Sequence, residues 1–255
     1  MDPVDIPASA SPPLLRPTWI PVFGNAFRLA VLLAVLASAV RGIGMLGPPR
    51  FFWILPVGFT VMALTPWLFF RREGRRRAGV RLPKRGQWVL LGILMGAASA
   101  VLFYWLGVTL FGETNDNWFV SVQRAFPVTA EMAGLSTGQL FWILTIPSLI
   151  FSPLGEEIFF RGFLQQATEE RWDHRTGVIV DAGWFALVHV VHHGIVKIDG
   201  RIQVLPLSGA IWMALIFGIG VLFAFLRQKT GSLVAPILSH AAFNLTMNYT
   251  ILYWL

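Results

Sequence analysis

Long apolar runs separated by short polar segments make up most of this chain. Each run has roughly the 20 residues that a helix needs to cross a hydrocarbon core of about 30 Å. A spanning segment in a bilayer must be helical, because no water is present to satisfy an open backbone. The runs are Phe27–Leu46, Phe51–Phe70, Gln87–Phe111, Gln139–Leu164, Gly177–His193, Ser208–Leu226 and Leu233–Leu255. The fifth run is the least hydrophobic, since it contains Asp181 and three histidines. The pattern predicts an all-α, polytopic transmembrane helical bundle with about seven spanning helices, six to eight being possible.

Composition supports this prediction and excludes other classes. The chain has 255 residues, of which 55% are hydrophobic and only 13% are charged. A soluble domain usually carries about 25% charged residues, so this chain has too little polar surface for a water-facing globule. The net charge of +7 would suggest nucleic-acid binding in a soluble protein. Here the basic residues lie in short loops between apolar runs, which indicates a membrane protein and no nucleic-acid partner. The absence of cysteine excludes disulfides, thiolate catalysis and Cys-based zinc sites.

The loops also predict an orientation. Arg71–Arg85 holds eight Lys/Arg residues and one glutamate, and cytoplasmic loops are enriched in such residues. Placing this loop in the cytoplasm puts the N-terminus inside and the C-terminus outside. It also puts four further basic residues inside, namely Arg171, Arg175, Arg227 and Lys229. Asn115–Glu131, with a single arginine, falls outside. We interpret Arg71–Arg85 as a topology determinant that also touches anionic lipid. We expect an integral protein of a bacterial inner (cytoplasmic) membrane.

We divide the chain into three parts. Residues 1–26 are predicted to form an N-terminal cytoplasmic tail, since the first 17 are acidic at their start, rich in proline and unlike a cleavable signal peptide. Residues 27–138 hold the first spanning helices and the basic loop 71–85, and carry no motif. Residues 139–255 hold the polar motifs described next.

Three clusters of polar residues lie inside the later apolar runs. Ionisable groups within spanning helices are costly and usually face a cavity or each other, so each is a functional hypothesis. The clusters are Glu156, Glu157 and Arg161; His189, with His192 and His193; and His240 with Asn244. From a rise of 1.5 Å per residue, the three clusters lie about 11–18 Å from the cytoplasmic side. The sequence therefore predicts one polar chamber in the cytoplasmic half of the membrane, open to the cytoplasmic side.

Within each cluster the spacing is four, which places two side chains on one helix face. Glu157 and Arg161 are predicted to form an i,i+4 ion pair, which either orients a functional carboxylate or is only structural. Glu156 has Phe160 at i+4 and so has no such partner on its own helix. A carboxylate in apolar surroundings can serve as a general base near neutral pH.

The motifs Glu156-Glu157-x-x-x-Arg161, Phe185-x-x-x-His189 and His240-x-x-x-Asn244 together resemble the signature of a known family. This is the CAAX protease and bacteriocin-processing (CPBP or Abi) family of intramembrane endopeptidases, and the resemblance covers roughly residues 139–255. It implies a protease in which Glu156 activates a water, His189 helps to hold it, and His240 and Asn244 stabilise the oxyanion. Glu157 and Arg161 would shape the chamber, and Phe185 would pack against it. The partners implied are the lipid bilayer and a membrane-associated peptide or protein substrate.

Cofactor use has two interpretations. We expect no cofactor, because Asn244 suits an oxyanion better than zinc, and zinc proteases generally separate metal ligands from the general base. The alternative is a zinc site formed by Glu156, His189 and His240. His193, four residues after His189, has the spacing of a further ligand, although interfacial histidines are commonly without function. The roles of His192, His193 and Asp181 stay open.

A second functional class also stays open. The buried carboxylates suit a non-enzymatic immunity or regulatory protein, or a small transporter. The sequence contains no inverted repeat, and the combination of Glu, His and Asn favours hydrolysis. Substrate identity and oligomeric state are not indicated by any residue pattern.

Overall fold

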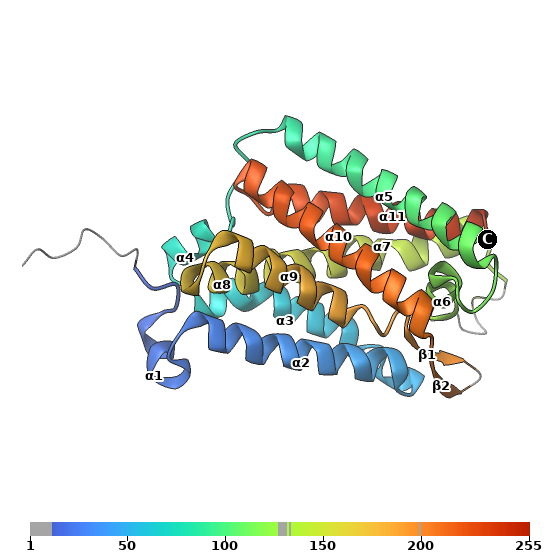
Figure 1. The fold of residues 1–255 in the computed structure, drawn as a ribbon, viewed down its shortest axis with the longest axis horizontal. Helices are drawn as coiled ribbons and strands as arrows, with labels where there is room; N and C mark the ends of the chain where they lie inside the picture. The colour runs from blue at the N-terminus through green and yellow to red at the C-terminus, as the bar shows by residue number, and fades with distance from the viewer. Residues whose placement is uncertain (1–11, 127–131, 133, 199) are drawn as a thin grey trace, which may run out of the picture.

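The structure is a computed structural model that describes residues 12–126, 132, 134–198 and 200–255. The fold is an all-α helical bundle, as predicted (Figure 1). The longer helices are α2 (Ala26–Leu46), α3 (Ile54–Phe69), α5 (Gln87–Phe111), α7 (Thr137–Glu157), α9 (His174–Val188), α10 (Pro206–Thr230) and α11 (Val234–Tyr253). The shorter elements are η1 (Pro17–Trp19), α1 (Ile20–Phe23), η2 (Pro49–Phe51), α4 (Arg72–Arg77), α6 (Trp118–Arg124), η4 (Ile158–Leu164), α8 (Gln165–Arg171), β1 (Ile195–Ile198) and β2 (Arg201–Val204).

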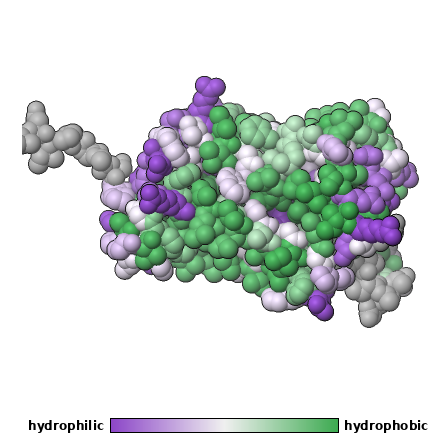
Figure 2. All heavy atoms as spheres, turned by 60° about the horizontal axis from the view of Figure 1, so that its bottom comes forward, coloured by the Kyte–Doolittle hydropathy of each residue, from purple (hydrophilic) through white to green (hydrophobic). Residues whose placement is uncertain are grey.

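Among the described residues, five helical segments, two of which join neighbouring elements, are long and apolar enough to cross a membrane. They are Ala26–Leu46, Pro49–Phe69, Gln87–Phe111, Thr137–Arg171 and Pro206–Thr230. The other two predicted spans form helices α9, which has only 15 residues, and α11. Figure 2 shows a broad hydrophobic band across the middle of the molecule, with hydrophilic residues gathered toward its two ends. An apolar surface of this kind matches a lipid environment.

The basic loops come together at one end of the bundle, which we call the basic end. The segment that follows α3 contacts the connection between α10 and α11 there. Arg227 donates from Nη2 to the carbonyl of Arg77 at 3.2 Å, and Lys84 donates its backbone N–H to the carbonyl of Thr230 at 3.1 Å. Arg227 also pairs with Glu169 of α8 at 3.4 Å. The C-terminus of α2, α6, the β-hairpin and the C-terminus of α11 lie at the opposite end (Figure 1).

Helix α7 continues through η4, a π-helix, into α8 without leaving the helical path. Pro147 and Pro153 lie inside α7, where a proline removes one backbone hydrogen bond. Both therefore open the helix before Glu156. Pro236, by contrast, is the third residue of α11, where the N–H groups have no intrahelical partner. Pro236 therefore removes no hydrogen bond within α11.

Glycines set the closest helix contacts around the site. A Cβ on Gly96 of α5 would lie 2.0 Å from the backbone oxygen of Ser239, so α5 and α11 pack backbone against backbone. A Cβ on Gly155 would lie 2.5 Å from the carbonyl oxygen of Phe59. This second contact brings α3 against α7 directly beside Glu156.

Three segments differ from the sequence prediction. The fifth run, predicted to reach His193, is helical only to Val188 and is followed by a turn and the short β-hairpin. Leu14 and Leu15, predicted to belong to the N-terminal tail, are buried in the bundle. Residues 1–11 of the tail, and residues 127–131 of the loop predicted to lie outside, are not among the described residues.

Candidate active site

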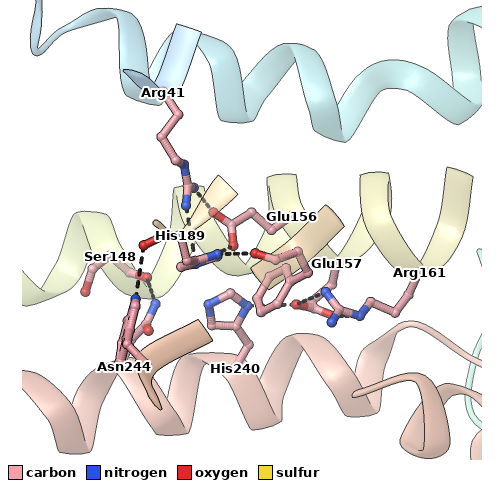
Figure 3. Close-up of polar contacts among 10 residues, drawn as sticks. Arg41, Ser148, Glu156, Glu157, Arg161, His189, His240 and Asn244 are labelled. Carbon is pink, nitrogen blue, oxygen red and sulfur yellow. Dashed lines mark hydrogen bonds and ion pairs between the residues drawn. The ribbon is translucent and has the colours of Figure 1, made fainter. Parts of the chain in front are cut away.

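The structure brings the three motif clusters together inside the bundle (Figure 3). Glu156 and Glu157 come from the end of α7, His189 from the C-cap of α9, and His240 and Asn244 from α11. Neither glutamate is exposed. Because the two are neighbours on a helix, their side chains point in different directions and meet different partners.

Glu156 meets an arginine and a histidine. Arg41 of α2 donates from Nη2 to Oε1 of Glu156. His189 places its Nε2 3.6 Å from Oε2 of Glu156. That second oxygen has no hydrogen-bond partner among the described residues. Oε2 of Glu157 and both carboxylate oxygens of Asp181 are likewise buried without a hydrogen-bond partner, so the neighbouring His189 is what distinguishes Oε2 of Glu156.

The ring state of His189 follows from its two contacts. Nδ1 lies 2.6 Å from the carbonyl oxygen of Phe185, which only accepts, so Nδ1 carries a proton. Arg41 donates from Nη1 to Nε2 at 3.3 Å, so Nε2 is an acceptor. The imidazole is therefore neutral in this arrangement. Trp212 further fixes the chain by donating to the backbone oxygen of His189 at 3.0 Å.

Glu157 belongs to a buried network of ion pairs. Nε of Arg161 lies 3.3 Å from Oε2 of Glu157 and 3.2 Å from Oδ2 of Asp181, and none of the three side chains is exposed. The ion pair between Glu157 and Arg161 was predicted from the sequence. Asp181 is a second carboxylate beside the same guanidinium. Glu157 also accepts a hydrogen bond from Nδ1 of His240 at 2.8 Å. Space for the guanidinium is left by Gly220, since a Cβ there would lie 3.1 Å from Nη2 of Arg161.

Phe185 forms an aromatic wall between these groups. Its ring centroid lies 4.4 Å from the ring of His189 and 5.9 Å from the ring of His240. The guanidinium carbon of Arg161 lies 4.1 Å from the same ring centroid. A cation over a ring face is attracted electrostatically. The packing role suggested for Phe185 by the sequence fits these contacts.

Asn244 is held one turn further along α11. Its Nδ2 donates to the backbone oxygen of Ser148 at 2.9 Å. Asn248 donates to Oγ of Ser148 at 3.0 Å and to Oγ1 of Thr145 at 3.2 Å. The carbonyl of Ser148 is one that a regular helix would pair with Ser152. An amide nitrogen has two hydrogens, so Asn244 keeps one for another acceptor.

A cavity of about 550 Å³ adjoins the site. Its polar lining includes Arg41, His189, His192, His240 and Asn244. The remainder of its wall is mainly apolar and comes from α3, α6, α7, α10 and α11. The cavity extends away from the basic end, since its lining includes residues near the C-terminus of α2 and from α6.

The side chains of the two additional histidines have different surroundings. His192 lines the cavity, with its ring 5.0 Å from that of His189. His193 is buried, and its Nδ1 lies 2.8 Å from the hydroxyl of Ser121 on α6. Because α9 ends at Val188, His193 does not share a helix face with His189. The i,i+4 ligand spacing considered for this pair is therefore wrong.

Sequence reasoning missed Arg41. The first apolar run holds two charged residues, Arg28 next to its start and Arg41 well inside it, and the rule that flagged the three motif clusters applies to Arg41 equally. Its side chain is 6% exposed, and its guanidinium contacts both Glu156 and His189. Within the described ranges, no three His, Asp or Glu side chains are grouped as a metal site would require.

Comparison with known proteins identifies the part of the chain that carries the motifs. No curated protein and no solved structure shows significant similarity to the chain. Residues 138–246 match the family described as type II CAAX prenyl endopeptidase Rce1-like. The match spans Glu156, Glu157, Arg161, Phe185, His189, His240 and Asn244, and leaves out Arg41. The family predicted from the three motifs, that of the CAAX proteases, is therefore confirmed for residues 138–246.

Proposed function

We propose that this protein is an intramembrane endopeptidase in which Glu156 activates a water for attack on a peptide bond. The family match and the apolar helices support an endopeptidase within the membrane. The observation that carries the mechanism is the arrangement at Glu156: Oε1 is bonded to Arg41, while Oε2 is left without a protein partner beside His189. A general base needs an oxygen that is free to accept the proton it removes, and Oε2 lies 3.6 Å from His189, which lines the cavity.

His240 and Asn244 are proposed to stabilise the oxyanion of the tetrahedral intermediate. Both line the cavity, and each is hydrogen-bonded to a fixed partner, His240 to Glu157 and Asn244 to the backbone of Ser148. Fixed donors are what an oxyanion site requires. Glu157 accepts from Nδ1 of His240, so donation from Nε2 requires the doubly protonated ring. The carboxylate of Glu157, 2.8 Å away, is placed to balance that charge.

The cavity suggests the class of substrate. Its mainly apolar wall suits a membrane-associated polypeptide that presents an apolar segment near the scissile bond. The name of the matched family refers to prenylated CAAX substrates, and a prenyl chain would meet the same requirement.

We propose that the reaction requires no metal. Two of the three ligands considered for zinc, Glu156 and His189, already share the guanidinium of Arg41. Nδ1 of the third, His240, faces Glu157. A divalent cation bound between these groups would lie against a fixed positive charge, which is unfavourable.

Cleavage of a membrane-bound reporter by the purified protein tests this function. The wild-type protein should cleave, and Glu156→Gln should lower kcat by at least about 10²–10⁴-fold while it inserts and purifies normally. Wild-type turnover in a folded Glu156→Gln protein would remove Glu156 from the mechanism. No cleavage by the wild-type protein would favour the non-enzymatic alternative, a regulatory protein or transporter.

The side of the membrane from which the substrate enters depends on orientation. We propose that the basic end is cytoplasmic. The cavity extends toward the other end. With the basic end in the cytoplasm, the cavity would therefore not open to the cytoplasm, contrary to the expectation from the sequence.

The cysteine-free chain permits a direct test, because single cysteines at Arg77 and Glu113 can be labelled from either side. The orientation predicts protection of the first and labelling of the second by an impermeant reagent added outside. The reverse pattern would place the cavity end in the cytoplasm.

A further inference from the structure

Arg41 is a buried cation that the family motifs do not include. It lies on α2, nearly 100 residues before the matched region, and is 6% exposed. A charge within a spanning helix is costly unless it is paired, and such residues usually have a function. Among the described residues, its polar contacts are with Glu156 and His189, and its guanidinium carbon lies 5.1 Å from the ring centroid of Phe59.

The two polar contacts use the two ends of the guanidinium fork. Nη2 donates to Oε1 of Glu156, and Nη1 donates to Nε2 of His189 at 3.3 Å. The fork is planar and rigid, so the two acceptors are fixed relative to one another. Figure 3 shows the side chain of Arg41 reaching from α2 to both residues, on the side of Glu156 away from Glu157.

We propose that Arg41 is a positioning residue that makes Oε2 of Glu156 the base. This inference rests on the proposed function. By bonding to Oε1, Arg41 fixes the rotation of the carboxylate and leaves Oε2 toward His189. Its charge also compensates an ionised carboxylate that is otherwise buried without a cation. Helix α2, outside the family region, thus completes the site.

A lysine does not reproduce this geometry. An ammonium is a compact charge and lacks the planar fork, so Arg→Lys exchange is not conservative where two acceptors are bridged. Arg41→Lys is therefore expected to preserve charge compensation and lose orientation. Arg41→Ala loses both and leaves a space beside the cavity, into which a small cation can diffuse.

The experiment compares Arg41→Ala, Arg41→Lys and the control Arg28→Ala on the reporter that the wild-type protein cleaves and Glu156→Gln does not. Arg28 lies on the same helix and is exposed. A loss of orientation costs about 10²-fold in turnover, so Arg41→Ala should show at least this fall in kcat, with KM little changed. Arg41→Lys should lie between Arg41→Ala and wild type, and Arg28→Ala should match wild type. Added guanidinium should restore kcat to Arg41→Ala more effectively than methylammonium does.

The outcomes separate this inference from the proposed function. Loss of cleavage in Glu156→Gln with wild-type kcat in folded Arg41→Lys would keep the function and overturn the role of Arg41. An increase in KM at constant kcat would overturn it too, because Arg41 would then bind substrate. Equal rescue by methylammonium would overturn the requirement for the fork. If Arg41→Ala does not fold, the kcat of Arg41→Lys decides.

Discussion

The two neighbouring glutamates of α7 have opposite surroundings. Glu156 pairs with one cation, and both of its partners, Arg41 and His189, line the cavity. Glu157 lies in a network with Arg161 and Asp181, neither of which lines the cavity. Oε2 of each glutamate lacks a hydrogen-bond partner among the described residues. For Glu157 this oxygen lies 3.3 Å from the guanidinium of Arg161, whereas for Glu156 it lies 3.6 Å from the cavity-lining His189.

On the proposed mechanism, one motif supplies two functions. Charged groups buried away from water are stable only when they are paired. The Glu157 side is therefore expected to stabilise the fold. The Glu156 side borders a space that a substrate and water can enter, so it is expected to carry the chemistry. The predictions below test whether stability and turnover separate in this way.

The largest effect is expected from Arg161→Met. It leaves Glu157 and Asp181 buried without their cation, and breaking a buried ion pair in this way costs about 3–5 kcal/mol. Denaturation in detergent, followed by circular dichroism, should show this loss of stability. Glu156→Gln is the matched variant for the other side, since the glutamine retains an acceptor for Arg41.

Equal losses of stability in Arg161→Met and Glu156→Gln would break the comparison. The Glu157 side would then be no more structural than the Glu156 side. A stable Arg161→Met protein would mean that the carboxylates of Glu157 and Asp181 are compensated without the arginine.

A smaller effect is expected from Asn244→Ala. Removal of one oxyanion donor typically lowers kcat by about 10²–10³-fold. Steady-state kinetics should show this fall with little change in KM. Asn248→Ala, one turn further along α11, loses comparable hydrogen bonds to Ser148 and Thr145 and should lower kcat less. A pure KM defect in Asn244→Ala would assign Asn244 to substrate binding.

The smallest effect is expected from metal removal. A zinc ion would need Glu156 and His189 from one side and His240 from the other, and these residues already have protein partners. Exhaustive treatment with chelators, one of them membrane-permeable, should therefore leave the rate of reporter cleavage unchanged. Loss of activity that zinc alone restores would join the two sides into one metal centre and contradict the mechanism.

The sequence predicted the features that follow from local spacing and hydropathy. Apolar runs predicted the bundle, and the loop charges predicted that the basic segments share one end. The i,i+4 rule predicted the pair of Glu157 with Arg161, because both lie on one helix. The structure also brings Glu156, His189 and His240 together, as expected if the motifs lie at one depth.

Contacts between distant helices could not be predicted in the same way. Arg41 meets Glu156 only because α2 packs across α7, and 115 residues separate the two in the sequence. The sequence did not predict that α9 ends at Val188, because Val190 and Val191 beyond it continue the apolar run. The hairpin Ile195–Val204 alternates too briefly to be distinguished from a loop.

The π-helix of Ile158–Leu164 makes the site sensitive to chain length. In an α-helix each residue turns the chain by about 100°, so a one-residue deletion rotates everything beyond it by that angle. The wider π turn accommodates an additional residue between Glu156 and the part of α8 that contacts Arg227. If these seven residues took regular α geometry with none removed, every site side chain would be present, yet the glutamates would be turned out of phase with α8. Alignment of this segment by composition alone would overlook that loss, because the change is one of register.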